Sequence, residues 1–169
     1  TEISGDIRSS KWMKLLANVP EMLPSAILDL PLLSAANIPG MRPVMDEAAR
    51  EAYRVAQAAG ITMLPVLGKT AADIPNSDQY AVDLLETILS SFSRPDTRVA
   101  VLQDWDKGRR AEIDAFSGYI VALQESTGVS TPVNQMLVDA ALRIEAGELM
   151  PHPSNAELLI GEFDRIKSA

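Results

Sequence analysis

Apolar residues recur at intervals of three and four along most of the chain, as expected for helices that bury one face. The first stripe predicts a helix from Ser9 to about Met22, with Ser9 or Ser10 as its N-cap. Its apolar positions are Trp12, Leu15, Leu16 and Val19. Pro24 is expected to open a short second helix that Pro31 ends, because proline suits the first turn of a helix and interrupts its interior.

Further periodic stretches predict five more helices. They cover residues 43–59, 78–92, 111–127, 131–146 and 155–167. Thr131 and Pro132 form a typical helix start, with threonine as the cap and proline in the first turn. Residues 61–75 lose the period and are expected to form a loop. No strand alternation and no repeat of about 20–50 residues is visible, so the pattern predicts one all-α domain, residues 1–169, of six or seven helices.

Composition narrows the functions that this domain can have. The 169 residues carry a net charge of −8, which argues against binding to nucleic-acid phosphates. There is no cysteine and a single histidine, His152, so thiolate chemistry is excluded and no metal site is expected. No apolar run reaches the roughly 18 residues that cross a bilayer, and we expect a cytoplasmic protein. His152 lies between two prolines and is given no role.

Common enzyme motifs are missing from the sequence. It contains no glycine-rich phosphate loop, no helical pair of histidines and no G-x-S-x-G elbow. The chain begins without methionine in what reads as running sequence, so it is expected to be part of a longer protein.

The stretch "KWMKLLANV" places two polar groups on one side of an otherwise apolar helix. Lys14 and Asn18 are four residues apart, about 40° on the helical wheel, so both side chains can reach one spot. A lysine there could supply a proton or polarise a carbonyl, and an asparagine could donate and accept hydrogen bonds. From spacing alone, a solvated polar face is the favoured explanation of the pair.

A second stretch, "LQDWDKGRRAEIDAFSGYI", is dense in charge. Glu112 and Asp114 would stand in the first turn of the helix expected at 111–127, where carboxylates complement the helix dipole. Gly118 would permit close contact between helices. Arg109 and Arg110 are surface charges or partners of nearby carboxylates. Local features alone therefore favour a structural explanation of this stretch.

These two stretches, followed by "GVSTPVNQML", resemble the C-terminal domain of the ketopantoate reductase (2-dehydropantoate 2-reductase) family. The family pattern is roughly W-x-K-L-x-x-N, then Q-D-x-x-x-G-R-x-T-E-I-D-x-x-N-G, then G-x-x-[TV]-P-x-N. The resemblance covers most of residues 9–146. It implies an all-helical bundle similar to the C-terminal domain of 6-phosphogluconate dehydrogenase.

The resemblance also implies a reaction and roles for three residues. Such proteins join this domain to an N-terminal Rossmann domain that binds NADPH, and they reduce a 2-oxo acid in the cleft between the two. Lys14 matches the general acid, Asn18 matches a substrate-binding asparagine, and Glu112 matches the glutamate that binds the substrate hydroxyl. We therefore expect a small 2-oxo acid as substrate, a role in pantothenate biosynthesis, the chain's own Rossmann domain as partner, and a possible homodimer.

Four positions depart from the family pattern. Met22 stands where a second asparagine is usual, and Ala100 stands where a serine is often found. Ala111 and Ser117 replace a threonine and an asparagine. Because a site built for hydrogen bonds discriminates strongly, these changes favour retained chemistry on a different 2-oxo acid.

Two alternatives compete with the reductase hypothesis. One is a non-catalytic helical module that kept the fold for dimerisation or partner binding. The other is the C-terminal domain of an opine or hydroxyacid dehydrogenase, which explains the "GRRAEID" segment less well. Asn134, in "TPVN", is expected to support a helix start rather than to contact substrate.

Overall fold

The computed structural model describes residues 6–74 and 77–169, and every regular element in those ranges is helical. The α-helices are α1 (Ile7–Ile27), α2 (Leu32–Ala36), α3 (Met41–Ala58), α4 (Gln79–Thr87), α5 (Ala100–Asp106), α6 (Ser117–Ala122), α7 (Gln124–Thr127), α8 (Pro132–Glu145) and α9 (Asn155–Ser168). Shorter elements are the 3-10 turns η1 (Ala71–Asp73) and η3 (Ile113–Ala115) and the π-helical turn η2 (Ile88–Phe92). The all-α prediction is confirmed.

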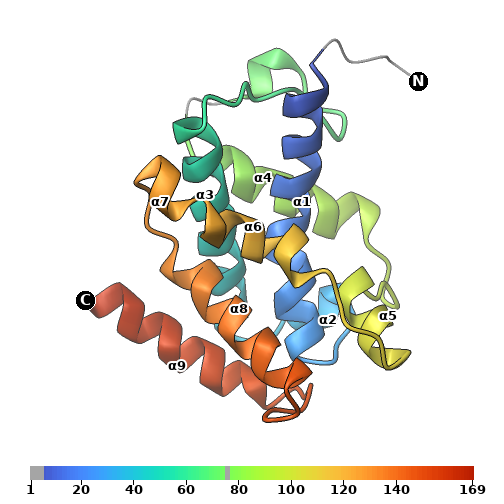
Figure 1. Ribbon diagram of the computed structural model, residues 1–169. Coiled ribbons are helices and arrows are strands. Elements are labelled where there is room, and N and C mark those ends of the chain that lie inside the picture. Colours follow the sequence, from blue (N-terminus) through green and yellow to red (C-terminus); the bar gives the residue numbers. More distant parts are fainter. Residues whose placement is uncertain (1–5, 75–76) are drawn as a thin grey trace.

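Helix α1 runs through the middle of the fold and packs against α3, α4, α5 and α8 (Figure 1). Its inward face is completely buried at Leu16, Val19 and Leu23. Helix α9 lies across the outside of α3 and α8, and the C-terminus ends away from α1. The polar side of α1 therefore belongs to a helix whose opposite face is held in the core.

Helix α1 is longer than the sequence predicts. It continues through Pro20 and Pro24 to Ile27, so the expected separate helix starting at Pro24 is wrong. Each proline in a helix interior removes a hydrogen bond and costs about 3 kcal/mol. Almost every side chain from Val19 to Leu28 is buried, and this burial offsets the cost. The N-cap is Asp6 rather than Ser9 or Ser10, since its carboxylate accepts the Ser9 N–H at 2.9 Å.

The helix expected at residues 111–127 is divided into η3, α6 and α7. The chain breaks at Phe116, whose φ and ψ are −117° and −113°. Gly118 does not mediate contact with another helix: a Cβ there would stand 2.9 Å from the Ile113 carbonyl oxygen, so the glycine allows the chain to fold back on η3. With the short α2 and α5, this division gives nine α-helices in the described ranges, where six or seven were expected.

The N-terminus of α8 is capped by a carboxylate from another helix. Glu51 of α3 is 1% exposed and accepts the backbone N–H groups of Val133 and Asn134, both at 2.8 Å. It also accepts the Asn134 side-chain amide at 2.8 Å. Thr131 occupies the N-cap position without a side-chain cap bond. Pro132 does take the first turn, and Asn134 supports the helix start, as the sequence predicts.

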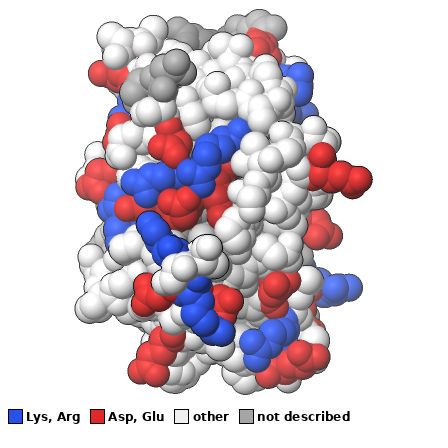
Figure 2. Space-filling model, turned by 90° about the vertical axis from the view of Figure 1, so that its left-hand side faces the viewer, with Lys and Arg blue, Asp and Glu red and all other residues white. Residues whose placement is uncertain are grey.

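Surface charges on α3 join it to α4 and to the segment before it. Arg42 bonds Asp46 and Glu86, both at 2.7 Å, and Arg54 bonds Asp78 at 2.9 Å. On the face drawn in Figure 2, basic and acidic side chains alternate without a broad patch of one sign. This face offers no continuous basic track for a phosphate backbone.

No helix in the described ranges is both long and apolar enough to span a membrane.

Replacing Glu51 by alanine should destabilise the fold by about 3 kcal/mol or more, because the backbone N–H groups of Val133 and Asn134 would be left buried without an acceptor. The Asn134 side-chain amide would keep only its bond to the Ala48 carbonyl at 3.0 Å. Urea unfolding at neutral pH measures the effect. Glu47→Ala is the matched control, since Glu47 lies one turn earlier on α3 and makes only partly exposed ion pairs, which contribute less than about 1 kcal/mol. Equal losses in the two variants would contradict the capping role.

Candidate active site

The three candidate residues line one hollow on the surface. We call it the main hollow. It is lined by Lys11, Lys14, Leu15, Asn18, Met22, Ala100, Glu112, Ala115 and Phe116. The volume is about 540 Å³, within the range of small-molecule sites. Lys14 and Asn18 come from α1, whereas Glu112 comes from the turn that precedes η3. The structure thus brings together side chains that are far apart in the sequence.

The polar groups of this hollow are free to meet a ligand. Lys14 and Glu112 are exposed and Asn18 is half-buried. Among the residues that the structure describes, no hydrogen bond or ion pair engages any of the three side chains. The Lys14 ammonium, the Asn18 amide and the Glu112 carboxylate therefore line one hollow and make no hydrogen bond or ion pair with the described part of the protein.

Two of the four departures from the family pattern also line the main hollow. Met22 is 9% exposed and Ala100 is exposed, and both belong to its walls. Ala111 and Ser117 are not among the lining residues; Ser117 is fully buried. The loss of polar groups at Met22 and Ala100 therefore changes the hollow itself.

Helix α1 gives Lys14 and Asn18 a rigid support. The neighbouring Met13 and Leu16 are buried in the core, so the helix cannot rotate without exposing them. Near the N-terminal end of α1, the Trp12 and Tyr119 rings pack with centroids 5.8 Å apart and link α1 to α6.

The turn that carries Glu112 is held by Glu145, at the end of α8. Its carboxylate accepts the Ala111 N–H at 2.8 Å, the Arg110 Nε–H at 3.0 Å and the Trp105 Nε1–H at 3.3 Å. The Glu145 side chain is 8% exposed, whereas that of Arg110 is 86% exposed. The buried bond to Ala111 thus fixes the residue next to Glu112, and the Arg110 ion pair contributes little.

Burial raises the pKa of Glu145, but the bonds from Ala111, Arg110 and Trp105 lower it by more, so the net pKa lies below its usual value. The ionised form is therefore the one that the fold stabilises.

A second hollow, which we call the side hollow, lies on the other side of Lys14 and Asn18. It measures about 480 Å³ and is lined by Ser10, Met13, Lys14, Ala17, Asn18, Glu21, Leu32, Val66, Leu67, Ile88, Phe92, Ser93 and Thr97. Lys14 and Asn18 border both hollows. Glu21 is partly buried, and burial raises its pKa to about 7.

Sequence analysis identified neither Glu21 nor Glu145. Glu21 follows Lys14 by seven residues and Asn18 by three, so extending the helical wheel by one turn would have placed it on the same face. Glu145 carries no such signal, because its partner Ala111 is 34 residues away.

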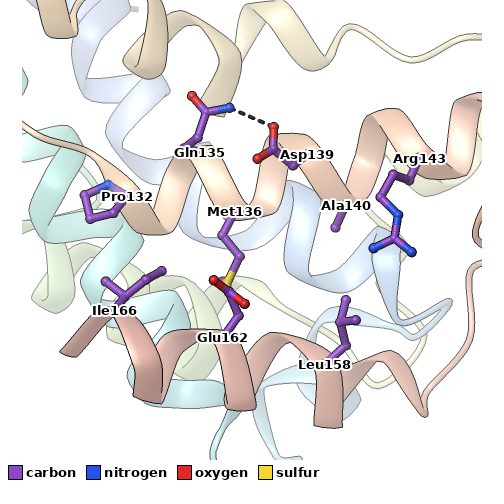
Figure 3. Close-up of a pocket in the computed structure, with 9 residues that line it drawn as sticks. All are labelled: Pro132, Gln135, Met136, Asp139, Ala140, Arg143, Leu158, Glu162 and Ile166. Atoms are coloured by element: carbon purple, nitrogen blue, oxygen red, sulfur yellow. Dashed lines mark hydrogen bonds between the residues drawn. The ribbon is translucent and has the colours of Figure 1, made fainter. Parts of the chain in front are cut away.

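A groove between α8 and α9 shares no lining residue with either hollow (Figure 3). Its floor includes Met136, Leu158 and Ile166, and the Gln135 amide donates to Asp139 at 2.8 Å. It is therefore separate from the candidate site. His152 lies elsewhere again, with its backbone N–H donating to the Ile27 carbonyl at 3.1 Å. Within the described ranges, no cluster of three His, Asp or Glu side chains could hold a metal ion.

Comparison with known proteins decides the family. Residues 6–145 match the family model described as the C-terminal part of the ketopantoate reductases PanE/ApbA. The chain belongs to this family. It is thus homologous to oxidoreductases, and the ketopantoate reductase match includes every element that lines the main hollow. No match is found among curated protein sequences.

Solved structures of ketopantoate reductases and of a dehydrogenase share the fold. A PanE/ApbA family ketopantoate reductase from Ralstonia eutropha JMP134 is 26% identical, with a TM-score of 0.70. The match covers 87% of this chain and 44% of that protein. A D-mandelate dehydrogenase bound to NADH and anilino(oxo)acetate is 20% identical with a TM-score of 0.71, covering 87% of this chain and 43% of that one.

The dimeric ketopantoate reductase from Staphylococcus aureus is 18% identical, with a TM-score of 0.68 and coverage of 86% and 46%. The chain therefore spans less than half the length of each of these three proteins.

Replacing Glu145 by alanine should loosen the turn that carries Glu112. We expect the Ala111 amide to exchange with solvent about 10–100-fold faster and the fold to lose about 1–3 kcal/mol at neutral pH. Amide exchange by NMR and urea unfolding measure the two effects.

The pH dependence of the Glu145 effect has a definite sign. Because its pKa in the fold is lowered, the stability that it contributes is present above its unfolded pKa of about 4.5 and is lost as the pH falls through the folded value. The difference between wild type and Glu145→Ala should therefore shrink below pH 4. A stability difference that does not change with pH would contradict the conclusion that the ionised form of Glu145 holds the turn.

Replacing Glu21 by glutamine should stabilise the chain at high pH. The raised pKa means that stability is fully present below about pH 4.5 and is lost as the pH rises through about 7, where the buried group ionises. Each tenfold change in proton affinity corresponds to about 1.4 kcal/mol, so the variant should gain up to about 3.5 kcal/mol at pH 9 and little at pH 4.5. Urea unfolding at both pH values tests this, with the exposed Glu157→Gln as control. Equal gains at both values would contradict it.

Proposed function

We propose that this chain is the substrate-binding and proton-donating half of an NADPH-dependent reductase that converts a 2-oxo acid to the 2-hydroxy acid. Family membership supports the reaction class. The observation that carries the proposal is the convergence of Lys14, Asn18 and Glu112 on one hollow, with none of the three engaged by another described residue.

The chemistry follows from the charge that the reaction creates. When a hydride reaches the 2-oxo carbon, the carbonyl π bond breaks and its electron pair moves to oxygen. Lys14 would stabilise this charge and give the oxygen a proton from Nζ. Asn18 would hold the substrate through its amide, and Glu112 would accept a hydrogen bond from a substrate hydroxyl.

A nicotinamide cofactor, held mainly by an N-terminal Rossmann domain, would supply the hydride. The described part of this chain is helical and contains no glycine-rich phosphate loop, so it fits the substrate side of such a cleft. Arg8 and Lys11 line a hollow that shares Lys11, Leu15 and Ala115 with the main hollow. The cationic side chains of Arg8 and Lys11 would meet the negative charge of the cofactor.

The substrate is ketopantoate or a related 2-oxo acid. Met22 and Ala100 make the walls of the main hollow less polar than the family pattern, while Glu112 keeps a group that binds a hydroxyl. A wall that gains apolar groups favours substrates with more apolar surface at that point.

Replacing Lys14 by alanine in the full-length protein should lower kcat by about 10²–10⁴-fold while leaving NADPH binding almost unchanged. Steady-state reduction of a panel of 2-oxo acids that includes ketopantoate gives kcat, and fluorescence titration gives NADPH affinity. Lys107→Ala is the control, since Lys107 is exposed and lines neither hollow. Unchanged turnover in Lys14→Ala would sink the proposal.

The non-catalytic alternative makes opposite predictions. It requires that the full-length protein reduce no 2-oxo acid and that the sequence before Thr1 lack a G-x-G-x-x-G strand–turn–helix. Finding that glycine-rich fingerprint, together with reduction of a 2-oxo acid by the full-length protein, would rule out the non-catalytic alternative.

A further inference from the structure

The side hollow adjoins the candidate active site along one face of α1. Lys14, Asn18 and Glu21 occupy positions i, i+4 and i+7, which share one helical face. Lys14 and Asn18 line both hollows, whereas Glu21 lines only the side hollow. A molecule held by Lys14 and Asn18 can therefore extend along α1 towards Glu21.

The walls of the side hollow are mainly apolar. The charged groups among its lining residues are Lys14 and Glu21. They are seven residues apart, which is about 10 Å along the helix axis, and no ion pair joins them. Helices α1 and α2, the loop after α3, and η2 supply Met13, Ala17, Leu32, Val66, Leu67, Ile88 and Phe92. The hollow thus offers one cation and one anion, separated by apolar surface.

Glu21 has no partner in this wall. Among the described residues, no hydrogen bond or ion pair engages its carboxyl group, and burial raises its pKa to about 7. Taking a carboxylate partly out of water costs free energy unless a partner compensates. A cation compensates it more fully than a neutral donor does, because hydrogen bonds between ionised groups are about twice as strong as neutral ones. The missing partner of Glu21 is therefore a positive charge.

The backbone around the side hollow departs from regular geometry at two places. Residues Ile88–Phe92 form a π-helical turn, and Leu67 has a φ of 56°. Both π-helical turns and left-handed residues other than glycine cost energy and are concentrated at functional sites. Because Leu67, Ile88 and Phe92 line the hollow, both irregularities shape its walls.

We propose that the side hollow receives the side chain of the 2-oxo acid, and that Glu21 selects side chains that carry a positive charge at the end of an apolar stem. This inference rests on the proposed function, because it takes Lys14 and Asn18 as the groups that hold the 2-oxo acid end. Glu112 lines the main hollow and not the side hollow, so the two carboxylates meet different parts of the substrate. The volume of about 480 Å³ accommodates such a side chain.

The test compares two isosteric substrates in the full-length protein with NADPH. 6-(Trimethylammonio)-2-oxohexanoate and 7,7-dimethyl-2-oxooctanoate differ only in whether nitrogen or carbon bears the terminal methyl groups. The quaternary ammonium is charged at every pH and cannot cyclise onto the 2-oxo group. The assay is run at about pH 8, above the Glu21 pKa of about 7, so that the carboxylate is ionised. Wild type should favour the cationic compound in kcat/KM by about tenfold or more.

Glu21→Gln keeps the size of the side chain and removes its charge, so the ratio of the two kcat/KM values should fall to about one or below. Glu21→Leu should favour the neutral compound. Glu157→Gln, at an exposed position on α9, is the matched control and should keep the wild-type ratio. Because a ratio is compared, a general loss of activity does not imitate the effect. Urea unfolding checks that each variant is folded.

Three outcomes overturn the inference while the reductase reaction stands. The first is wild type that reduces both compounds without preferring the cationic one. The second is a preference for the cationic compound that survives both Glu21→Gln and Glu21→Leu. The third is wild type that reduces pyruvate or ketopantoate but neither of the longer compounds. Wild type that reduces no 2-oxo acid of any size would instead overturn the proposed function and the inference together.

Discussion

The fold depends on one buried carboxylate that ties two helices together. Glu51 of α3 accepts two backbone N–H groups at the start of α8 and the amide of Asn134, each at 2.8 Å. Burial raises the pKa of Glu51, while these donors act against the increase. A helix start inside a protein has free N–H groups that need acceptors. Because Glu51 supplies them from α3, the position of α8 is fixed relative to the helix that packs along α1.

The bonds between Glu51 of α3 and the start of α8 also determine part of the geometry of the candidate site. At its other end, α8 carries Glu145, which holds the Ala111 N–H and so the turn that bears Glu112. Lys14 and Asn18 are fixed separately, because the opposite face of α1 lies in the core. The acidic and basic sides of the main hollow are therefore joined through α3 and α8 rather than by direct bonds between them. Such an arrangement leaves the functional groups available for a ligand while their supports stay rigid.

Local periodicity predicted most of the helices and the Lys14–Asn18 face, since both depend on spacing within one segment. It failed at Pro20 and Pro24, where burial outweighs the usual effect of proline, and at residues 111–127, where the chain breaks at Phe116. Neither the Glu51 cap nor the Glu145 anchor could be predicted, because their partners are 82 and 34 residues away. The link between Glu112 and Lys14 came from family resemblance, which carries the long-range information that spacing lacks.

The central claim is that α1 and the turn before η3 face one substrate. A double-mutant cycle tests it most directly: kcat/KM for the preferred 2-oxo acid is measured in full-length wild type, Asn18→Ala, Glu112→Ala and the double variant. Two residues that contact the same small molecule should be coupled, so the double variant should differ from the sum of the single effects by about 0.5 kcal/mol or more. Effects that add within about 0.3 kcal/mol would show that the two residues act independently and would contradict a shared site.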